Sequence, residues 1–145
     1  MISLKLTSTS EYALRAMSLI SFLPKSQSLR AVAIAEKTRV PLHYLQKILR
    51  KLVKAGLVVS IKGHGGGFRL SRPPGRITYG TILEAMGYEK GLSDCVFGWG
   101  RCRESRPCPM HGSWSQLNRQ FVAWAEDTTL AHILDYSREK GIADY

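Results

Sequence analysis

Apolar residues recur every three or four positions in several stretches of the chain, as they do in helices with one buried face. In the first of these stretches one face collects Ala13, Met17, Ile20 and Leu23. Ser10 stands where an N-cap would begin this helix, and Pro24 stands where a helix would end. The pattern therefore predicts a core helix between these two residues.

Two further helical patterns follow, at residues 29–37 and 41–55, with a short turn at 38–40. Pro41 suits the first position of the second helix, and Gly56 suits a left-handed stop after it. Two helices joined by a tight turn, with the second one basic, are typical of a helix-turn-helix. The sequence predicts that motif here.

The helix expected over 41–55 carries two opposite stripes. The apolar stripe, which should face the core, consists of Leu42, Leu45, Leu49 and Leu52. The basic stripe, which should face outward, consists of His43, Lys47, Arg50 and Lys54. A basic helical face is often only solvated surface, but the neighbouring motifs favour a DNA-binding face here.

Residues 57–62 are rich in β-branched side chains and strand-like, and with residues 68–70 they predict a β-hairpin that has four glycines between residues 63 and 67 at its tip. The glycines are not followed by a Lys-Ser/Thr pair or a helix start, so a nucleotide-binding loop is poorly supported. A DNA-contacting wing fits better, because glycines allow the backbone to approach phosphates closely. Lys62, His64 and Arg69 line this hairpin. A linker at 72–76 and a short helix capped by Thr78 come next.

The last third of the chain is strongly helical. Ser113 is a candidate N-cap for a helix with an aromatic and aliphatic stripe of Trp114, Leu117, Phe121 and Trp124. Such a stripe is typical of a helix that packs against a partner, so we expect a homodimer. A final helix should start near Asp127 and pack back onto the body.

These patterns together predict a mainly α fold with a small β-hairpin. A winged helix-turn-helix domain would span residues 1–87, and a cysteine loop 88–112. Residues 113–145 would form a long dimerisation helix and a C-terminal helix. The length of 145 residues suits one such domain with a small appendage.

Charge is divided unevenly along the chain. Residues 1–94 hold 15 Lys and Arg against 5 Asp and Glu, whereas residues 95–145 hold six of each. Within 25–76 there are 12 basic side chains and one acidic one, Glu36. The positive potential is therefore concentrated on the helix-turn-helix and wing, which indicates a nucleic-acid partner.

All three cysteines fall in one short segment, at Cys95, Cys102 and Cys108, and His111 follows three residues after the last of them. Glycine and proline interrupt the segment, which disfavours a regular helix or strand and lets the thiols converge on one centre. An odd number of cysteines cannot all pair as disulfides. The chain starts without a signal-like segment and has no apolar run of roughly 20 residues, so we expect a cytoplasmic protein without a membrane partner.

The chemistry expected in this loop is that of a metal centre. Structural zinc usually takes two close ligand pairs, and only Cys108 with His111 approaches that spacing. An iron–sulfur cluster suits the wider spacing better, because clusters are held by thiolates and accept histidine as a substitute. Zinc, or a metal-free loop that senses redox conditions through its thiols, remains the alternative.

Four stretches of the sequence resemble one family when taken as a set. They are Leu6-Thr7 with Glu11-Tyr-Ala-Leu-Arg15, the Leu42-x-Tyr44-Leu45 helix, the Lys62-Gly-x-Gly-Gly-Gly67-Phe68 wing, and the three-cysteine loop. The set resembles the Rrf-type bacterial transcription regulators, the IscR/NsrR-like iron–sulfur winged-helix family. The match extends over nearly the whole chain. One departure is that six residues separate the first two cysteines, where five is common in the family.

The resemblance implies a homodimer whose loop holds a [2Fe-2S] or [4Fe-4S] cluster through Cys95, Cys102 and Cys108. It leaves two candidates for the fourth ligand. His111 would act within its own chain, whereas Glu11 would be supplied by the other protomer. Glu11 also suits the first turn of its helix, where a carboxylate interacts well with the helix dipole.

The sequence thus predicts a transcription regulator, acting as a repressor on a palindromic double-stranded operator under control of the cluster. His43, Tyr44, Gln46 and Lys47 would read bases, and Arg50, Lys51, Lys54 and Lys62 would hold phosphates. No set of nucleophile, base and acid and no cofactor fingerprint is present in the sequence, so we do not expect an enzyme.

Overall fold

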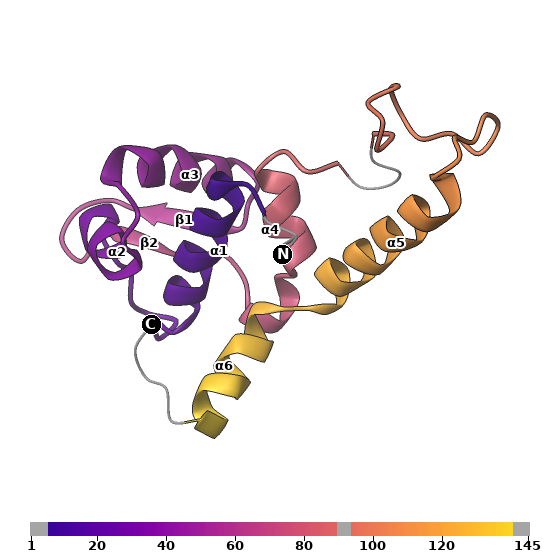
Figure 1. Ribbon diagram of the computed structural model, residues 1–145. Coiled ribbons are helices and arrows are strands. Elements are labelled where there is room, and N and C mark those ends of the chain that lie inside the picture. Colours follow the sequence, from indigo (N-terminus) through magenta and orange to yellow (C-terminus); the bar gives the residue numbers. More distant parts are fainter. Residues whose placement is uncertain (1–5, 90–93, 141–145) are drawn as a thin grey trace.

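The computed structural model describes residues 6–89 and 94–140. Its elements are, in chain order, α1 (Ser8–Ser21), α2 (Ala31–Thr38), α3 (Leu42–Lys54), β1 (Val58–Ile61), β2 (Gly67–Leu70), the 3-10 helix η1 (Pro74–Arg76), α4 (Tyr79–Ala85), α5 (His111–Asp127) and α6 (Leu130–Lys140). Figure 1 shows a compact head, made of α1 to α4, the hairpin and α6, from which α5 projects as an arm. Each of the three segments expected from the sequence has a short part outside the described residues. These parts are residues 1–5, 90–93 and 141–145.

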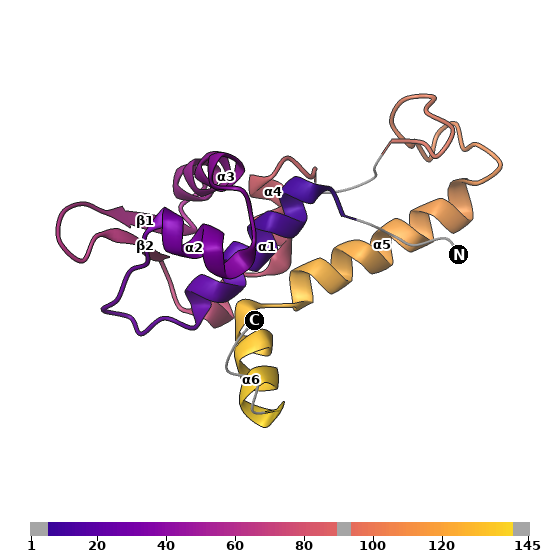
Figure 2. The ribbon, with the colours of Figure 1, turned by 60° about the vertical axis from the view of Figure 1, so that its left-hand side comes forward.

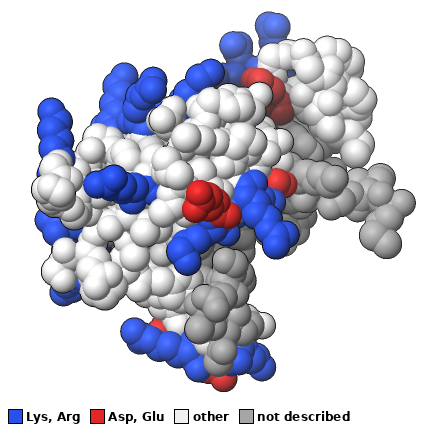
Figure 3. Space-filling model, turned by 90° about the vertical axis from the view of Figure 1, so that its left-hand side faces the viewer, with Lys and Arg blue, Asp and Glu red and all other residues white. Residues whose placement is uncertain are grey.

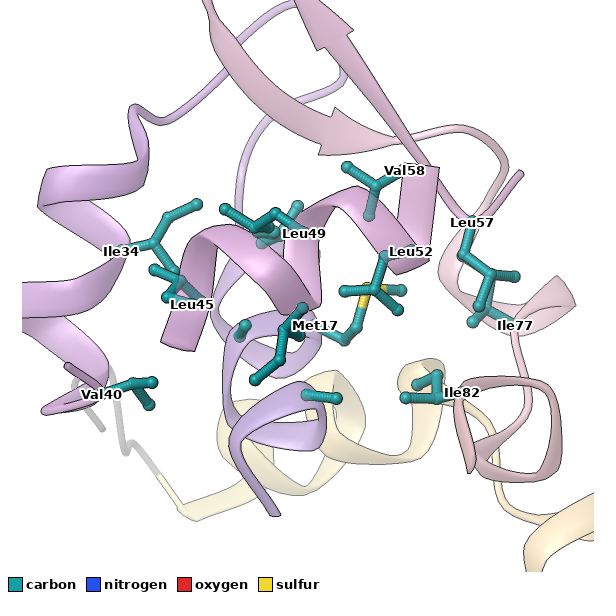
Figure 4. Packing of buried hydrophobic residues seen from close by; sticks show 14 of the residues in the cluster. Met17, Ile34, Val40, Leu45, Leu49, Leu52, Leu57, Val58, Ile77 and Ile82 are labelled. Atoms are coloured by element: carbon teal, nitrogen blue, oxygen red, sulfur yellow. The ribbon is translucent and has the colours of Figure 1, made fainter. Parts of the chain in front are cut away.

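Helix α1 is the central element of the head, because α2, α3, α4, α6 and β2 all pack against it. Its apolar face enters a core in which Met17 and Ile20 are buried together with side chains from every neighbouring helix (Figure 4). The N-cap is Thr7, whose hydroxyl accepts a hydrogen bond from the backbone N–H of Ser10. The predicted cap at Ser10 is therefore wrong: Ser10 lies in the first turn and is fully buried.

The predicted helix-turn-helix is formed, but Pro41 is the N-cap of α3 and not its first helical residue. Helix α2 ends at Thr38, and its C-cap Arg39 has a φ of 55°, in the left-handed region, which turns the chain toward α3. In α3 the buried residues are Leu45, Ile48, Leu49 and Leu52. Leu42 was expected in the apolar stripe but is 36% exposed, because it lies in the first turn beyond the edge of the core.

The hairpin is a two-stranded antiparallel sheet in which Val58 pairs with Leu70 and Ile61 with Gly67. It is attached to the head by a third, short pairing: Leu29 and Phe68 exchange backbone hydrogen bonds of 3.0 and 2.8 Å. This pairing brings the backbone of Gly67 against that of Leu29, where a Cβ atom would lie 2.4 Å from the Leu29 carbonyl oxygen. Glycine is therefore required at this point of the wing.

The chain returns from the arm to the head beside the start of α4. Thr78, which caps α4 as predicted, forms a β-bridge with Thr129. The Tyr79 N–H donates to the Thr128 carbonyl at 2.8 Å, and the Leu130 N–H donates to the Ile77 carbonyl at 3.0 Å. Helix α6 then packs on α1, which confirms that the last helix returns to the body.

The two helices flanking this return differ from the prediction at their ends. Helix α5 begins at His111 rather than after Ser113, and it runs on through Asp127, which was expected to start the next helix. Helix α6 begins instead at Leu130, where His132 Nδ1 accepts a hydrogen bond of 2.9 Å from the Thr129 N–H.

Among the described residues, none of the helices is long and apolar enough to cross a membrane.

Candidate DNA-binding surface and cysteine loop

The outward face of α3 is set by its buried face. With Leu45, Ile48, Leu49 and Leu52 turned into the core, the remaining side chains of the helix must face solvent. All the candidate DNA-binding residues of α3 are exposed: His43, Tyr44, Gln46, Lys47, Arg50, Lys51 and Lys54. The His43 and Tyr44 rings lie 4.1 Å apart at the first turn of the helix. The fold thus presents an aromatic and polar tip followed by a row of cations.

The candidate DNA-binding residues of the wing differ in their exposure to solvent. Lys62 and His64 are exposed on the hairpin. Arg69 lies on β2 and is partly buried, and its Nη1 donates to the backbone carbonyl of Lys25 at 3.3 Å. Arg69 therefore links the wing to the loop after α1, and it is less available to DNA than the other two.

A groove of about 430 Å³ lies between α1 and α3 and was not identified from the sequence. It is lined by Ser8, Thr9, Tyr12, Tyr44, Lys47, Ile48 and Lys51. The hydroxyl groups of α1 therefore border the same surface as two of the expected DNA-binding lysines. The sequence shows the hydroxyl residues and the basic helix separately, and only the fold brings them together.

The surface charge agrees with the division seen along the chain. Figure 3 shows Lys and Arg side chains spread over the head, with few Asp and Glu among them. Glu36, the one acidic residue between 25 and 76, lies exposed on α2 rather than on α3 or the wing. The exposed face of α3 therefore carries cations without a neighbouring carboxylate in its own helix, which favours a polyanion.

The part of the cysteine loop between the undescribed residues and α5, residues 94–110, lies at the far end of the arm from the head (Figures 1 and 2). A tight turn closes its first part: Asp94 forms a β-bridge with Arg101, and the Cys95 N–H donates to the Gly100 carbonyl at 2.7 Å. Gly98 and Gly100 have φ angles of 70° and 86°, which other residues rarely adopt. An ion pair between Arg101 and Glu89 joins this turn to the chain before it.

The second part of the loop is fixed to the start of α5. The His111 N–H donates to the Cys108 carbonyl at 2.9 Å. The indole N–H of Trp114, one turn further on, donates to the Asp94 carbonyl at 3.0 Å. These contacts hold the first and last cysteines of the loop near each other at the end of the helix.

The four candidate donors in the loop come together in two pairs. The sulfur atoms of Cys95 and Cys108 lie 3.6 Å apart, and Cys102 Sγ lies 3.1 Å from His111 Nδ1. Cys95 and Cys102 are buried, at 9% and 7% exposure, while Cys108 is partly exposed. In the described part of the chain, no three His, Cys, Asp or Glu side chains converge as ligands of a single metal ion.

The thiols share an electrostatic environment. The backbone N–H of Phe97 lowers the pKa of the Cys95 thiol, with help from Cys108 and the Trp99 N–H and against the effect of burial. Burial raises the pKa of Cys102, and the charges of Cys108 and Cys95 raise it further. The three sulfurs therefore lie close enough to repel one another as thiolates, a repulsion that a bound cationic centre would remove.

Chemically, the donor set fits an iron–sulfur centre. Three thiols and one imidazole are the ligand types that hold such clusters, and donors grouped in twos suit a centre with more than one metal position. A single zinc ion would need four ligands around one point. Glu11, the other candidate ligand, lies on α1 in the head, and within one chain α1 and the cysteine loop lie apart (Figure 2).

The stripe on α5 is partly covered within the chain. The Trp124 ring contacts Tyr79 of α4 edge-on, with centroids 5.7 Å apart, and Phe121 lies 6.4 Å from the Tyr88 ring. Leu117 and Trp124 are nevertheless 45% and 44% exposed. Leu117 and part of Trp124 therefore leave apolar surface on the arm that the described part of the chain does not cover.

Comparison with known proteins identifies the relatives of this chain. Residues 6–136 match the model of the Rrf2 family, which is described as an iron-dependent transcriptional regulator. The HTH-type transcriptional regulator IscR of Vibrio atlanticus is 30% identical over 141 residues, covering 97% of this chain and 81% of that protein. IscR of Cronobacter sakazakii is 28% identical over 141 residues, covering 97% of this chain and 86% of that protein.

Solved structures agree with the sequence matches. The structure of CymR, the global cysteine regulator of B. subtilis, has a TM-score of 0.77 and 25% identity, covering 92% of this chain and 98% of that one. The IscR structure of T. potens has a TM-score of 0.78 and 24% identity, covering 99% of this chain and 95% of that one. These likenesses confirm the mainly α winged-helix fold expected from the sequence.

The basic helix-turn-helix, the wing and the matched relatives lead to one conclusion. The named relatives regulate transcription, in line with the expectation of a protein that is not an enzyme. This chain belongs to the Rrf2 family and is a DNA-binding transcription regulator similar to IscR.

Proposed function

We propose that this protein is a homodimeric repressor whose binding to a palindromic operator is controlled by an iron–sulfur cluster in the cysteine loop. The observation that carries the proposal is the arrangement of Cys95 with Cys108 and of Cys102 with His111 as two donor pairs, at 3.6 and 3.1 Å. The loop is separate from the DNA-binding head but joined to it through α5. A change in the loop can therefore reach the head through that helix and its partner.

In this proposal Cys95, Cys102 and Cys108 hold the cluster, which supplies a redox-responsive and ligand-responsive centre when bound. His111 is the preferred fourth ligand, since its ring nitrogen is already in contact with the Cys102 thiol. Burial of Cys95 and Cys102 limits access of water to their sulfurs. Partly exposed Cys108 marks the side from which small molecules reach the site.

The direct test of the cluster is the colour of protein purified without oxygen. We expect visible absorption, together with iron and inorganic sulfide in the sample. Colourless protein that contains zinc, or no metal, would contradict the cluster and favour the alternative.

That alternative is a cluster-free regulator that senses redox conditions through its thiols. One observation favours it: the sulfur atoms of Cys95 and Cys108 lie close enough to react with each other. We keep it as the second candidate, because a thiol sensor needs no imidazole beside its remaining cysteine.

On DNA, we propose that α3 of each protomer enters a major groove and that the hairpin contacts backbone beside it. The half-sites would lie about one helical turn apart, because a two-fold dimer presents its two recognition helices at that spacing. His43, Tyr44, Gln46 and Lys47, at the start of α3, would read bases. Arg50, Lys51, Lys54, Lys62 and His64 would contact phosphates, with Arg69 positioning the wing.

Replacing Lys54 or Gln46 by alanine should separate these two roles. Lys54→Ala should weaken binding to all DNA about equally and reduce the salt slope of log K by roughly one unit, because one phosphate contact is lost. Gln46→Ala should reduce specific binding by about 1–3 kcal/mol and leave non-specific binding nearly unchanged. Fluorescence anisotropy with operator and scrambled duplexes over a series of salt concentrations measures both. Equal losses on both duplexes for both variants would refute this division of roles.

Replacing each candidate fourth ligand by alanine tests the cluster assignment. His111→Ala should change the visible spectrum of anaerobic protein and make the cluster easier to lose, because an imidazole ligand is removed. Glu11→Ala should leave the spectrum as it is, if the carboxylate only interacts with the helix dipole. The opposite result, a changed spectrum for Glu11→Ala alone, would mean that the partner's first helix supplies the ligand and that the cluster bridges the dimer.

A further inference from the structure

We infer that Cys95 and Cys108 form an intrachain disulfide in the cluster-free protein, while Cys102 stays reduced beside His111. The disulfide would use two thiols that the proposed cluster also uses. It therefore concerns the chain without cluster, and it holds whether or not the cluster forms. Its consequence for cluster uptake rests on the proposed function.

The distances single out this pair of cysteines. A disulfide bond is about 2.05 Å long. The two sulfur atoms are 3.6 Å apart, so they must approach by roughly 1.5 Å, which small side-chain rotations and a slight loop movement can supply. Among the described residues this is the one pair of thiols in direct contact, because the Cys102 thiol is paired with His111 at 3.1 Å.

The backbone around the pair can accommodate the bond. The carbonyl of Cys108 and the indole N–H of Trp114 fix the end of the loop to α5 and to Asp94, beside Cys95. Gly98 and Gly100, in the segment between the two cysteines, provide freedom for the small shift. The turn therefore brings the two thiols together without help from a second chain.

The exposures suggest an order of reaction with a hydroperoxide as oxidant. Cys108 is partly exposed and is reached first. Its thiolate attacks one peroxide oxygen, the O–O bond breaks, and Cys108 becomes a sulfenic acid while water, or the alcohol of an organic peroxide, leaves. The buried Cys95 thiolate then attacks the Cys108 sulfur, the S–O bond breaks, and hydroxide leaves as water. In total two thiols lose two electrons and two protons, and the peroxide is reduced.

The product would differ from the cluster form in a defined way. Two of the three thiolate ligands would be blocked, so the chain could not take up a cluster until the bond was reduced. The Cys102 thiol would stay reduced beside His111. The same loop would thus exist in a metal-binding form and an oxidised form that exclude each other.

Thiol counting by mass spectrometry tests the inference on cluster-free full-length protein. After hydrogen peroxide, alkylation should modify one cysteine instead of three, and peptide mapping should identify it as Cys102, with a Cys95–Cys108 cross-linked peptide reversed by dithiothreitol. In Cys102→Ser the number of modified thiols should fall from two to none. In Cys108→Ser no intrachain disulfide should form between Cys95 and Cys102. A cross-link that includes Cys102, a cross-link between chains only, or three free thiols would overturn the inference.

Cluster loading separates this result from the proposed function. Iron and sulfide should give a coloured protein from the reduced sample and not from the peroxide-treated one. If the reduced sample also stays colourless while the cross-link is found, the disulfide stands and the cluster proposal fails. If the reduced sample is coloured and no cross-link is found, the cluster proposal stands and the disulfide fails.

Discussion

Leu117→Glu is expected to convert the proposed homodimer into monomers. Leu117 lies midway along the arm, is 45% exposed in the single chain, and belongs to the apolar face that we expect the partner to cover. A buried, unpaired glutamate would cost at least about 3 kcal/mol, and a two-fold interface contains the substitution twice. The dimer dissociation constant should therefore rise by more than roughly 100-fold. Sedimentation equilibrium over a range of concentrations measures it.

Gln116→Glu is the matched control for this experiment. It adds the same charge at the neighbouring exposed position, which points to a different side of α5. This variant should remain a dimer, and both variants should keep the circular dichroism of the parent. Leu117 is a cleaner site than Trp124, because the Trp124 ring also packs on Tyr79 within the chain. If the Leu117→Glu protein still sediments as a dimer, the assignment of α5 as the dimer interface is wrong.

Gly67→Ala is expected to destabilise the head and to displace the wing. Gly67 has a φ of 146°, and an added Cβ would lie 2.4 Å from the Leu29 carbonyl oxygen and 2.8 Å from the Arg30 nitrogen. Both contacts are with backbone, so the pairing of Leu29 with Phe68 must open. We expect a loss of about 2–4 kcal/mol and a decrease in Tm on the order of 10 °C, measured by thermal denaturation. Operator affinity should fall as well, because the hairpin would no longer be held against the head.

Gly65→Ala provides the comparison within the same turn. Gly65 also has a positive φ, of 68°, but an added Cβ would meet nothing within 4 Å. Its cost should be limited to backbone strain of about 1 kcal/mol. If the two variants lose equal stability, strain alone explains the effect, and the close approach to Leu29 does not.

The helices of the head could be predicted because their signals are local. The stripe on α3, the left-handed stop at Gly56 and the cap at Thr78 each depend on a few neighbouring residues. The helix starts were less certain for the same reason. Thr7 and Ser10 are both hydroxyl residues, and only the fold decides that Thr7 is the cap and Ser10 is buried. The start of α5 has no side-chain cap and is set by loop contacts with Cys108 and Met110.

The sequence predicted which residues belong to the candidate sites, but it did not predict which of these residues contact one another. The sequence indicated that three cysteines and His111 would gather in one loop, but the spacing does not reveal which donors pair with each other. The partial burial of Arg69 could not be foreseen either, because Lys25, which accepts its hydrogen bond, lies in a loop far from it in sequence. The groove between α1 and α3 joins residues from two separate helices, and a reading of each helix alone misses it.

The bridge between Thr78 and Thr129 has a consequence for how this protein can change in evolution. The chain leaves the head after α4 and returns beside the start of that helix, so the cysteine loop and α5 form an excursion that the bridge ties back to the head. An insertion or deletion in the cysteine loop does not shift the register of α1, α3 or the wing. The length of the loop can therefore change while the DNA-binding head keeps its structure.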